Sequence, residues 1–84
     1  MPADPELCRA VGTVLAESAG RALTVRQLST YVRPYVRVPA GVDDVQRAVT
    51  HLETRGEVRR LADPDDPALL SWTLTEAGRT RFAI

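Results

Sequence analysis

Apolar residues recur at helical spacing near the start of the chain. One face of such a helix would carry Leu7, Val11, Val14 and Leu15. The segment Asp4-Pro5-Glu6 comes just before and is typical of a helix start. Aspartate caps helices, proline suits the first turn, and an acid there favours the helix dipole. We therefore predict a first helix over about residues 5–18, ended by Ala19-Gly20.

A capping signal predicts a second helix. Thr24 is followed three residues later by Gln27, which is the spacing of a capping box. We expect this helix over about 25–33 and expect it to end at Pro34, because a proline pushes the preceding residue away from helical geometry. The short segment 21–23 could pair as a minor strand. The buried side of the helix would consist of Val25, Leu28 and Val32.

Residues 34–41, PYVRVPAG, form a connector with two prolines and a glycine. It is longer than the roughly three or four residues of a tight helix-turn-helix, and Tyr31 and Tyr35 are expected to pack beneath it. A third helix is predicted over about 42–55, with Gly56 as the residue that ends it. Its buried face would carry Val42, Val45, Ala48, Val49 and Leu52.

Strand and turn signals dominate the last third of the chain. A β-hairpin is predicted over about 57–74, with its turn at DPDDP. Trp72 alternates with apolar neighbours along the returning strand, which favours its burial. Thr75 is placed to cap a last short helix over about 76–82. We expect residues 1–84 to form one α+β domain, a three-helix bundle with a C-terminal hairpin, which is the winged helix-turn-helix layout.

The segment from Val45 to Arg79 resembles the winged helix of the MarR family of regulators. The resemblance is carried by THLETRG at the end of the third helix, the strand EVRRLAD, the turn DPDD and the closing segment LTEAGR. It implies that the third helix enters the major groove of DNA and that the hairpin, or wing, reaches the adjacent minor groove. It also implies that an acidic Asp-Pro-x-Asp tip is ordinary in such a wing.

Two features depart from the MarR pattern. Pro67 and Ala68 stand where MarR-type wings place arginine after the aspartates. Because the negative potential of a narrow minor groove favours an inserted arginine, we expect this wing to make weak minor-groove contact or none. MarR-type regulators also carry extra helices at both ends, which build a dimer and bind an effector. This chain of 84 residues is expected to be a minimal module without them.

Composition argues against several other classes of protein. The 11 basic residues, all arginines, balance 11 acidic residues, and this zero net charge weakens non-specific attraction to DNA phosphates. With no run of about 18 apolar residues and no signal peptide, we expect a cytoplasmic protein with no membrane partner. With one cysteine, Cys8, and one histidine, we expect no disulfide, metal or cofactor. No phosphate loop or nucleophile motif is found, so we expect no enzymatic activity.

The exposed side of the third helix carries side chains that can hydrogen-bond base edges or phosphates. Arginines at the end of that helix, on the first wing strand and on the second helix could follow the phosphate backbone. The candidate DNA-binding residues are Gln46, Arg47, Thr50, His51, Thr54, Arg55, Arg59, Arg60 and Arg26.

We predict from these residues a transcriptional regulator that binds double-stranded DNA with its third helix. Asp43, at the helix end that usually points into the groove, argues against this function, as do the missing wing arginine and the zero net charge. The alternative is a protein-interaction module or adaptor subunit with little or no DNA binding. A homodimer or another protein partner is compatible with either function.

Overall fold

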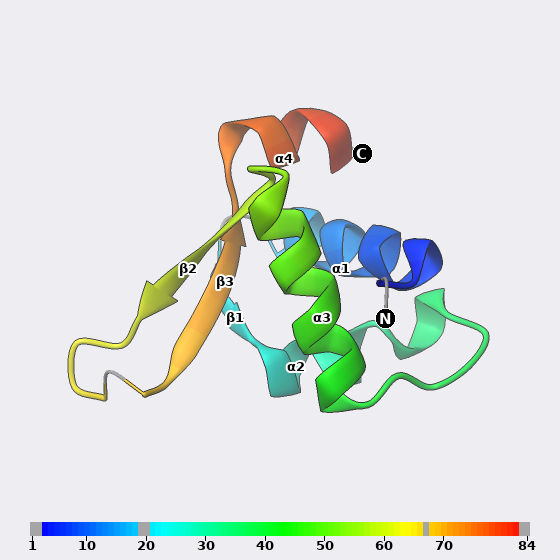
Figure 1. Ribbon diagram of the computed structural model, residues 1–84, viewed down its shortest axis with the longest axis horizontal. Helices are drawn as coiled ribbons and strands as arrows, with labels where there is room; N and C mark the ends of the chain where they lie inside the picture. Colours follow the sequence, from blue (N-terminus) through cyan, green and yellow to red (C-terminus); the bar gives the residue numbers. More distant parts are fainter. Residues whose placement is uncertain (1–2, 19–20, 67, 83–84) are drawn as a thin grey trace.

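The computed structural model describes residues 3–18, 21–66 and 68–82 and shows a helical body from which a β-hairpin extends (Figure 1). This α+β arrangement confirms the predicted winged-helix layout. Among the described residues, no helix is both long and apolar enough to cross a membrane. In chain order the elements are α1 (Pro5–Glu17), β1 (Leu23–Thr24), α2 (Val25–Tyr31), the 3-10 helix η1 (Arg33–Tyr35), α3 (Val42–Thr54), β2 (Val58–Ala62), β3 (Leu70–Leu74) and α4 (Glu76–Phe82).

The helices bury the apolar stripes that the sequence predicts, with one correction. Val42 is 45% exposed, so its predicted place on the buried face of α3 is wrong. At about 100° per residue, Val42 falls at the edge of a stripe centred between Val45 and Leu52. Val25 of α2 is half-buried. The predicted core residues that are buried are Leu7, Val11, Val14, Leu15, Leu28, Val32, Val45, Ala48, Val49 and Leu52.

The sheet has the strand order β1-β3-β2, and both pairings are antiparallel. In the central strand β3, Trp72 lies opposite Leu23 of β1 and Arg60 of β2. Trp72 and Leu74 are 2% and 5% exposed, because this face of the sheet packs on the helical core. The predicted burial of Trp72 is confirmed.

Thr24 ends β1 and begins α2. Its Oγ1 accepts a 3.2 Å hydrogen bond from the backbone N–H of Gln27, and the Oε1 of Gln27 accepts a 2.9 Å bond from the N–H of Thr24. The predicted capping box is therefore confirmed. The minor strand expected over 21–23 lies at Leu23–Thr24 instead. The expected end of the first helix, Ala19-Gly20, lies outside the described residues.

The end of α2 differs from the expectation that Pro34 stops the helix. The helix ends at Tyr31, and Pro34 lies inside the following 3-10 helix, Arg33–Tyr35. Proline fits there because its fixed φ suits the first positions of a helix and its missing N–H would have no helical partner. The N–H of Tyr35 donates a 2.8 Å bond to the carbonyl of Val32, which closes the turn.

Tyr31 and Tyr35 do not pack beneath the connector as expected. They are 49% and 43% exposed. The hydroxyl of Tyr35 donates a 2.5 Å hydrogen bond to Glu17 at the end of α1, and this bond raises the pKa of Tyr35. A tyrosine can keep its polar tip in solvent while its ring covers a neighbour, and the sequence pattern does not distinguish that arrangement from burial.

Close backbone contacts hold α4 against the rest of the domain. Thr75 caps this helix as predicted, because its Oγ1 accepts a 3.2 Å bond from the N–H of Gly78. A side chain at Gly12 of α1 would overlap the ring of Phe82, and one at Gly78 would overlap the backbone carbonyl oxygen of Glu57. Glycine at these two positions therefore allows α4 to approach both α1 and the start of the wing.

Candidate nucleic-acid interface

The side of α3 opposite the core forms an exposed polar face. Burial of Val45, Ala48, Val49 and Leu52 fixes how the helix is rotated about its own axis. The residues left in solvent are Asp43, Gln46, Arg47, Thr50, His51 and Thr54. We call these six residues the α3 face.

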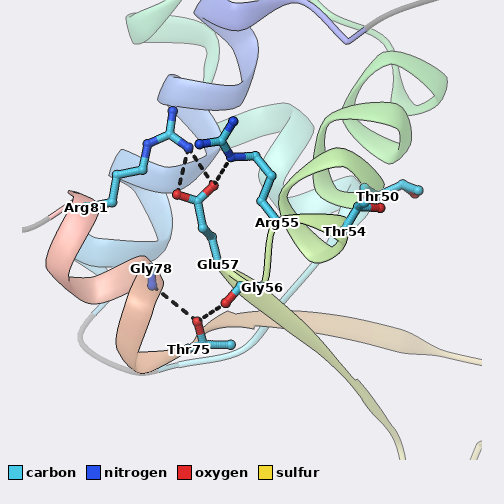
Figure 2. A network of polar contacts seen from close by, with 8 residues as sticks. All are labelled: Thr50, Thr54, Arg55, Gly56, Glu57, Thr75, Gly78 and Arg81. Carbon is cyan, nitrogen blue, oxygen red and sulfur yellow. Dashed lines mark hydrogen bonds and ion pairs between the residues drawn. The ribbon is translucent and has the colours of Figure 1, made fainter.

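Hydrogen bonds within the helix orient the middle of the α3 face. The Oγ1 of Thr50 donates 2.8 Å to the carbonyl of Gln46 and accepts 3.3 Å from the side-chain Nε2 of Gln46. The Oγ1 of Thr54 donates 3.0 Å to the carbonyl of Thr50. Figure 2 shows Thr50 and Thr54 on the side of the helix away from Glu57. Because these hydroxyl protons are engaged, the threonines present acceptor lone pairs to the outside.

Two of the candidate arginines have exposed acidic partners. Arg47 pairs with Asp44 one turn earlier on α3, and both side chains are 46% exposed. The Nε of Arg60 on β2 donates 3.0 Å to the carboxylate of Glu53, which connects the wing to α3. Exposed pairs of this kind are worth about 0–1 kcal/mol. Such a partner is therefore readily exchanged for a phosphate.

Two further candidate arginines have no carboxylate partner among the described residues. Arg59 lies on the strand β2 next to Arg60, and Arg26 lies in the first turn of α2. Both are exposed. The structure brings Arg60 close to α3 through Glu53. Arg26 belongs to the separate helix that packs beside α3.

A buried carboxylate lies at the junction of α3, β2 and α4 (Figure 2). The side chain of Glu57 is 7% exposed and its two oxygens accept bonds of 2.5 Å and 2.7 Å from Nη1 of Arg81. The Nε of Arg55 donates a 3.1 Å bond to the same carboxylate. The Arg81 hydrogen bond is the main cause that lowers the pKa of Glu57. Arg55 is thus occupied with a structural partner at this junction.

Backbone contacts at the same junction fix the base of the wing. Gly56 has a φ of 76°, a left-handed conformation that glycine adopts without strain, and it ends α3 as predicted. The Oγ1 of Thr75 donates a 2.6 Å bond to the carbonyl of Gly56, and the N–H of Thr75 donates 3.0 Å to the carbonyl of Glu57. These bonds join the start of the wing to the residue that caps α4. Sequence reasoning did not find Glu57 or Arg81, because 24 residues separate them and no local pattern joins them.

The aspartates of the wing tip shape its turn. The Oδ1 of Asp63 accepts 2.8 Å from the N–H of Asp65, and the Oδ1 of Asp66 accepts 3.2 Å from the N–H of Ala68. These side-chain bonds to backbone two residues ahead are typical of aspartate in turns. Ala68 is exposed, so the tip presents no cation at this position. Pro67 lies outside the described residues.

Comparisons with known proteins give solved structures but no sequence family. No family model matches the chain, and no curated protein matches it. A probable transcriptional regulator from Pseudomonas aeruginosa matches with a TM-score of 0.68 and 25% identity, over 89% of this chain and 51% of that protein. The transcriptional regulator BldR from Sulfolobus solfataricus matches with a TM-score of 0.70 and 24% identity, over 90% of this chain and 48% of that protein. A mutant MarR from E. coli, complexed with operator DNA, matches with a TM-score of 0.69 and 19% identity, over 88% of this chain and 48% of that protein.

The chain has a MarR-like winged helix-turn-helix fold. In this winged helix, α2 and α3 with their connector form the helix-turn-helix, and β2 and β3 form the wing. The chain spans about half the length of these three solved proteins. Within the described residues, no group of three or more histidine, cysteine or acidic side chains is placed to hold a metal ion.

Proposed function

We propose that this winged helix binds double-stranded DNA as a transcriptional regulator, with the α3 face in the major groove. The observation that carries the proposal is that Gln46, Arg47 and Thr50 stand in solvent on a helix whose rotation is fixed by four buried residues. Amides, guanidinium groups and hydroxyls are the side chains that read base edges. The role is one of binding without cofactor or metal, and we place it in the cytoplasm.

The arginines beside the α3 face are proposed as phosphate contacts. Arg26 and Arg59 have no carboxylate partner among the described residues and can approach phosphates directly. Arg60 would leave Glu53, and this exchange is inexpensive because the Arg60 side chain is 59% exposed. Arg55 contributes less in this proposal, because it is held by the buried carboxylate of Glu57. His51 and Thr54 lie in the last turns of α3 and would meet the backbone at the groove edge.

We also propose that two copies act together. A winged helix reads only a short half-site, and two copies bound one helical turn of DNA apart, about 34–36 Å, read a palindrome. Several structural neighbours are described as transcriptional regulators, and some were solved with DNA, which supports a DNA partner for this chain. Light scattering with and without a selected DNA duplex measures whether the bound unit is a dimer.

A protein-interaction role is the second candidate, and exposed apolar residues favour it. Val38 in the connector is 76% exposed, and Val42 at the start of α3 is 45% exposed. Leu61 and Leu69 are also exposed, near the outer part of the wing. These side chains would lie at or beside the surface that docks on DNA, so a protein partner there would exclude DNA.

A mobility-shift titration with genomic DNA fragments over a range of salt concentrations separates the two functions. Binding that weakens with salt supports the regulator. The variant Arg47→Ala should weaken binding to the selected site by about 1–3 kcal/mol. Arg79→Ala, an exposed arginine of α4, is the matched control and should bind as the wild type does. No binding at low salt would overturn the regulator and favour the adaptor, whereas an unchanged affinity of Arg47→Ala would remove that residue from the reading surface.

A further inference from the structure

The α3 face contains one acidic residue, Asp43, near the N-terminal end of the helix. It is the second residue of α3 and is exposed. Within the described residues it takes part in no ion pair and no side-chain hydrogen bond. Its neighbour Asp44 differs, because its carboxylate accepts a 3.0 Å bond from the N–H of Gly41 and pairs with Arg47. Asp44 therefore contributes to the polar contacts of the fold, whereas Asp43 has no side-chain partner in the described part of the chain.

The pairing of Arg47 with Asp44 increases the difference between the two aspartates. Asp43 and Arg47 are four residues apart, a spacing at which opposite charges on a helix commonly pair. Because Arg47 turns to Asp44 instead, no cation is placed beside the Asp43 carboxylate by its own helix. In a complex with DNA, the carboxylate would face the phosphates' negative field with only the dipole of α3 to offset it. A hydrogen-bond donor on the DNA would offset this unfavourable field.

Major-groove chemistry limits which donor that is. A carboxylate accepts hydrogen bonds and donates none. Guanine and thymine present acceptors at their major-groove edges, whereas cytosine N4 and adenine N6 carry donor hydrogens. Adenine places its N7 acceptor beside the amino group, which would repel the second carboxylate oxygen. Cytosine has no such acceptor and is the known partner of aspartate and glutamate.

We propose that Asp43 is a specificity-determining residue that selects a cytosine in each half-site by accepting a hydrogen bond from its N4 amino group. The proposal rests on the proposed function, namely that α3 docks in the major groove with its N-terminal residues toward the bases. Asp43 therefore lowers affinity for DNA in general and restores it at sites that carry cytosine at one position. An acid on a DNA-reading face thus raises specificity by disfavouring other sequences.

The test is selection of binding sites from a random duplex library, followed by affinity measurements on all four bases at each selected position. The wild type should require cytosine at one position per half-site, by about 5- to 150-fold over thymine or guanine. Asp43→Asn should shift this preference toward adenine, because an amide pairs with adenine N6 and N7. Asp43→Ala should lose the preference and bind unrelated DNA more tightly, because a negative charge has been removed.

The matched control is Glu76→Gln, which removes an exposed carboxylate from α4, at the end of the molecule opposite the start of α3 (Figure 1). It should keep the wild-type preference at every position. Circular dichroism checks that each variant is folded. Unchanged base preferences in both Asp43 variants would overturn the inference, even if their overall affinity rose, while DNA binding itself would stand. A wild type that binds no DNA would overturn the proposed function, and this inference with it.

Discussion

Replacing Gly78 with alanine tests whether close approach of α4 to the wing base holds the domain together. A methyl group at this position would overlap the backbone carbonyl oxygen of Glu57 and would lie 3.0 Å from Cδ2 of Leu74. The carbonyl is constrained, because it accepts a 3.0 Å hydrogen bond from the N–H of Thr75. The overlap is therefore with backbone on one side and a buried leucine on the other, and α4 must move to relieve it.

Two effects of Gly78→Ala oppose each other. Alanine is favoured over glycine within a helix by up to about 1 kcal/mol. Against this gain, overpacking costs about 1–3 kcal/mol, and loss of the Thr75–Glu57 hydrogen bond costs about 0.5–1.5 kcal/mol. Steric overlap should dominate, so we expect a net destabilisation of about 1–3 kcal/mol. The melting temperature should fall by about 4–8 °C for each kcal/mol in a domain of this size.

Urea unfolding followed by circular dichroism measures the free energy of unfolding directly. The control is Ala77→Gly, because Ala77 is exposed in the same helix and its replacement changes only helix propensity. Propensity alone predicts opposite signs for the two variants, whereas the packing argument predicts that both destabilise. A Gly78→Ala protein as stable as the wild type, or more stable, would refute the close-approach reasoning.

Three other substitutions test other parts of the structure. The lowered pKa of Glu57 means that its contribution to stability is complete above the unfolded glutamate pKa of about 4.3 and is lost as the pH falls through the folded value. Glu57→Gln should therefore lower the free energy of unfolding by about 1–2 kcal/mol at pH 7. It should also reduce the loss of stability at acid pH, and an unchanged acid dependence in pH-dependent unfolding would contradict this. Thr24→Ala removes the cap of α2 and should lower the free energy of unfolding, measured in urea, by about 1 kcal/mol. An unchanged free energy would mean that the capping box does not stabilise the domain. Ala68→Arg should tighten DNA binding and steepen its salt dependence if the wing tip reaches the minor groove. Ala77→Arg on α4 is the control in the same mobility-shift assay, and an equal gain in affinity for both variants would place the wing tip away from DNA.

Local signals in the sequence predicted the local parts of the structure. The capping box at Thr24, the left-handed glycine after α3 and the threonine cap of α4 each depend on residues within a few positions of one another. Apolar periodicity likewise identified the buried stripes of α1 and α3, because a helix can bury only one side against its neighbours. These features follow from chain geometry before any tertiary contact is known.

Tertiary contacts decided the features that the sequence did not predict. Tyr35 bonds Glu17, 18 residues away, instead of packing beneath the connector. The Glu57–Arg81 pair spans 24 residues, and nothing in either local segment marks it. At the candidate interface, spacing correctly placed Arg47 in solvent but could not say which of two adjacent aspartates it would pair with. Because Arg47 pairs with Asp44, Asp43 has no ion-pair partner among the described residues.

The placement of the acids is compatible with the proposed DNA binding of a protein with zero net charge. Asp44 and Glu53 each hold an arginine in an exposed pair worth about 0–1 kcal/mol, so contact with phosphate replaces a weak bond and costs little. Before contact, the same pairs cancel the field that would attract DNA of any sequence. In the proposed complex, hydrogen bonds to bases would add to the phosphate contacts of the arginines. Asp43, which has no side-chain partner among the described residues, would penalise sequences that offer no donor. The balance of charge therefore weakens non-specific binding more than it weakens binding to a matching site.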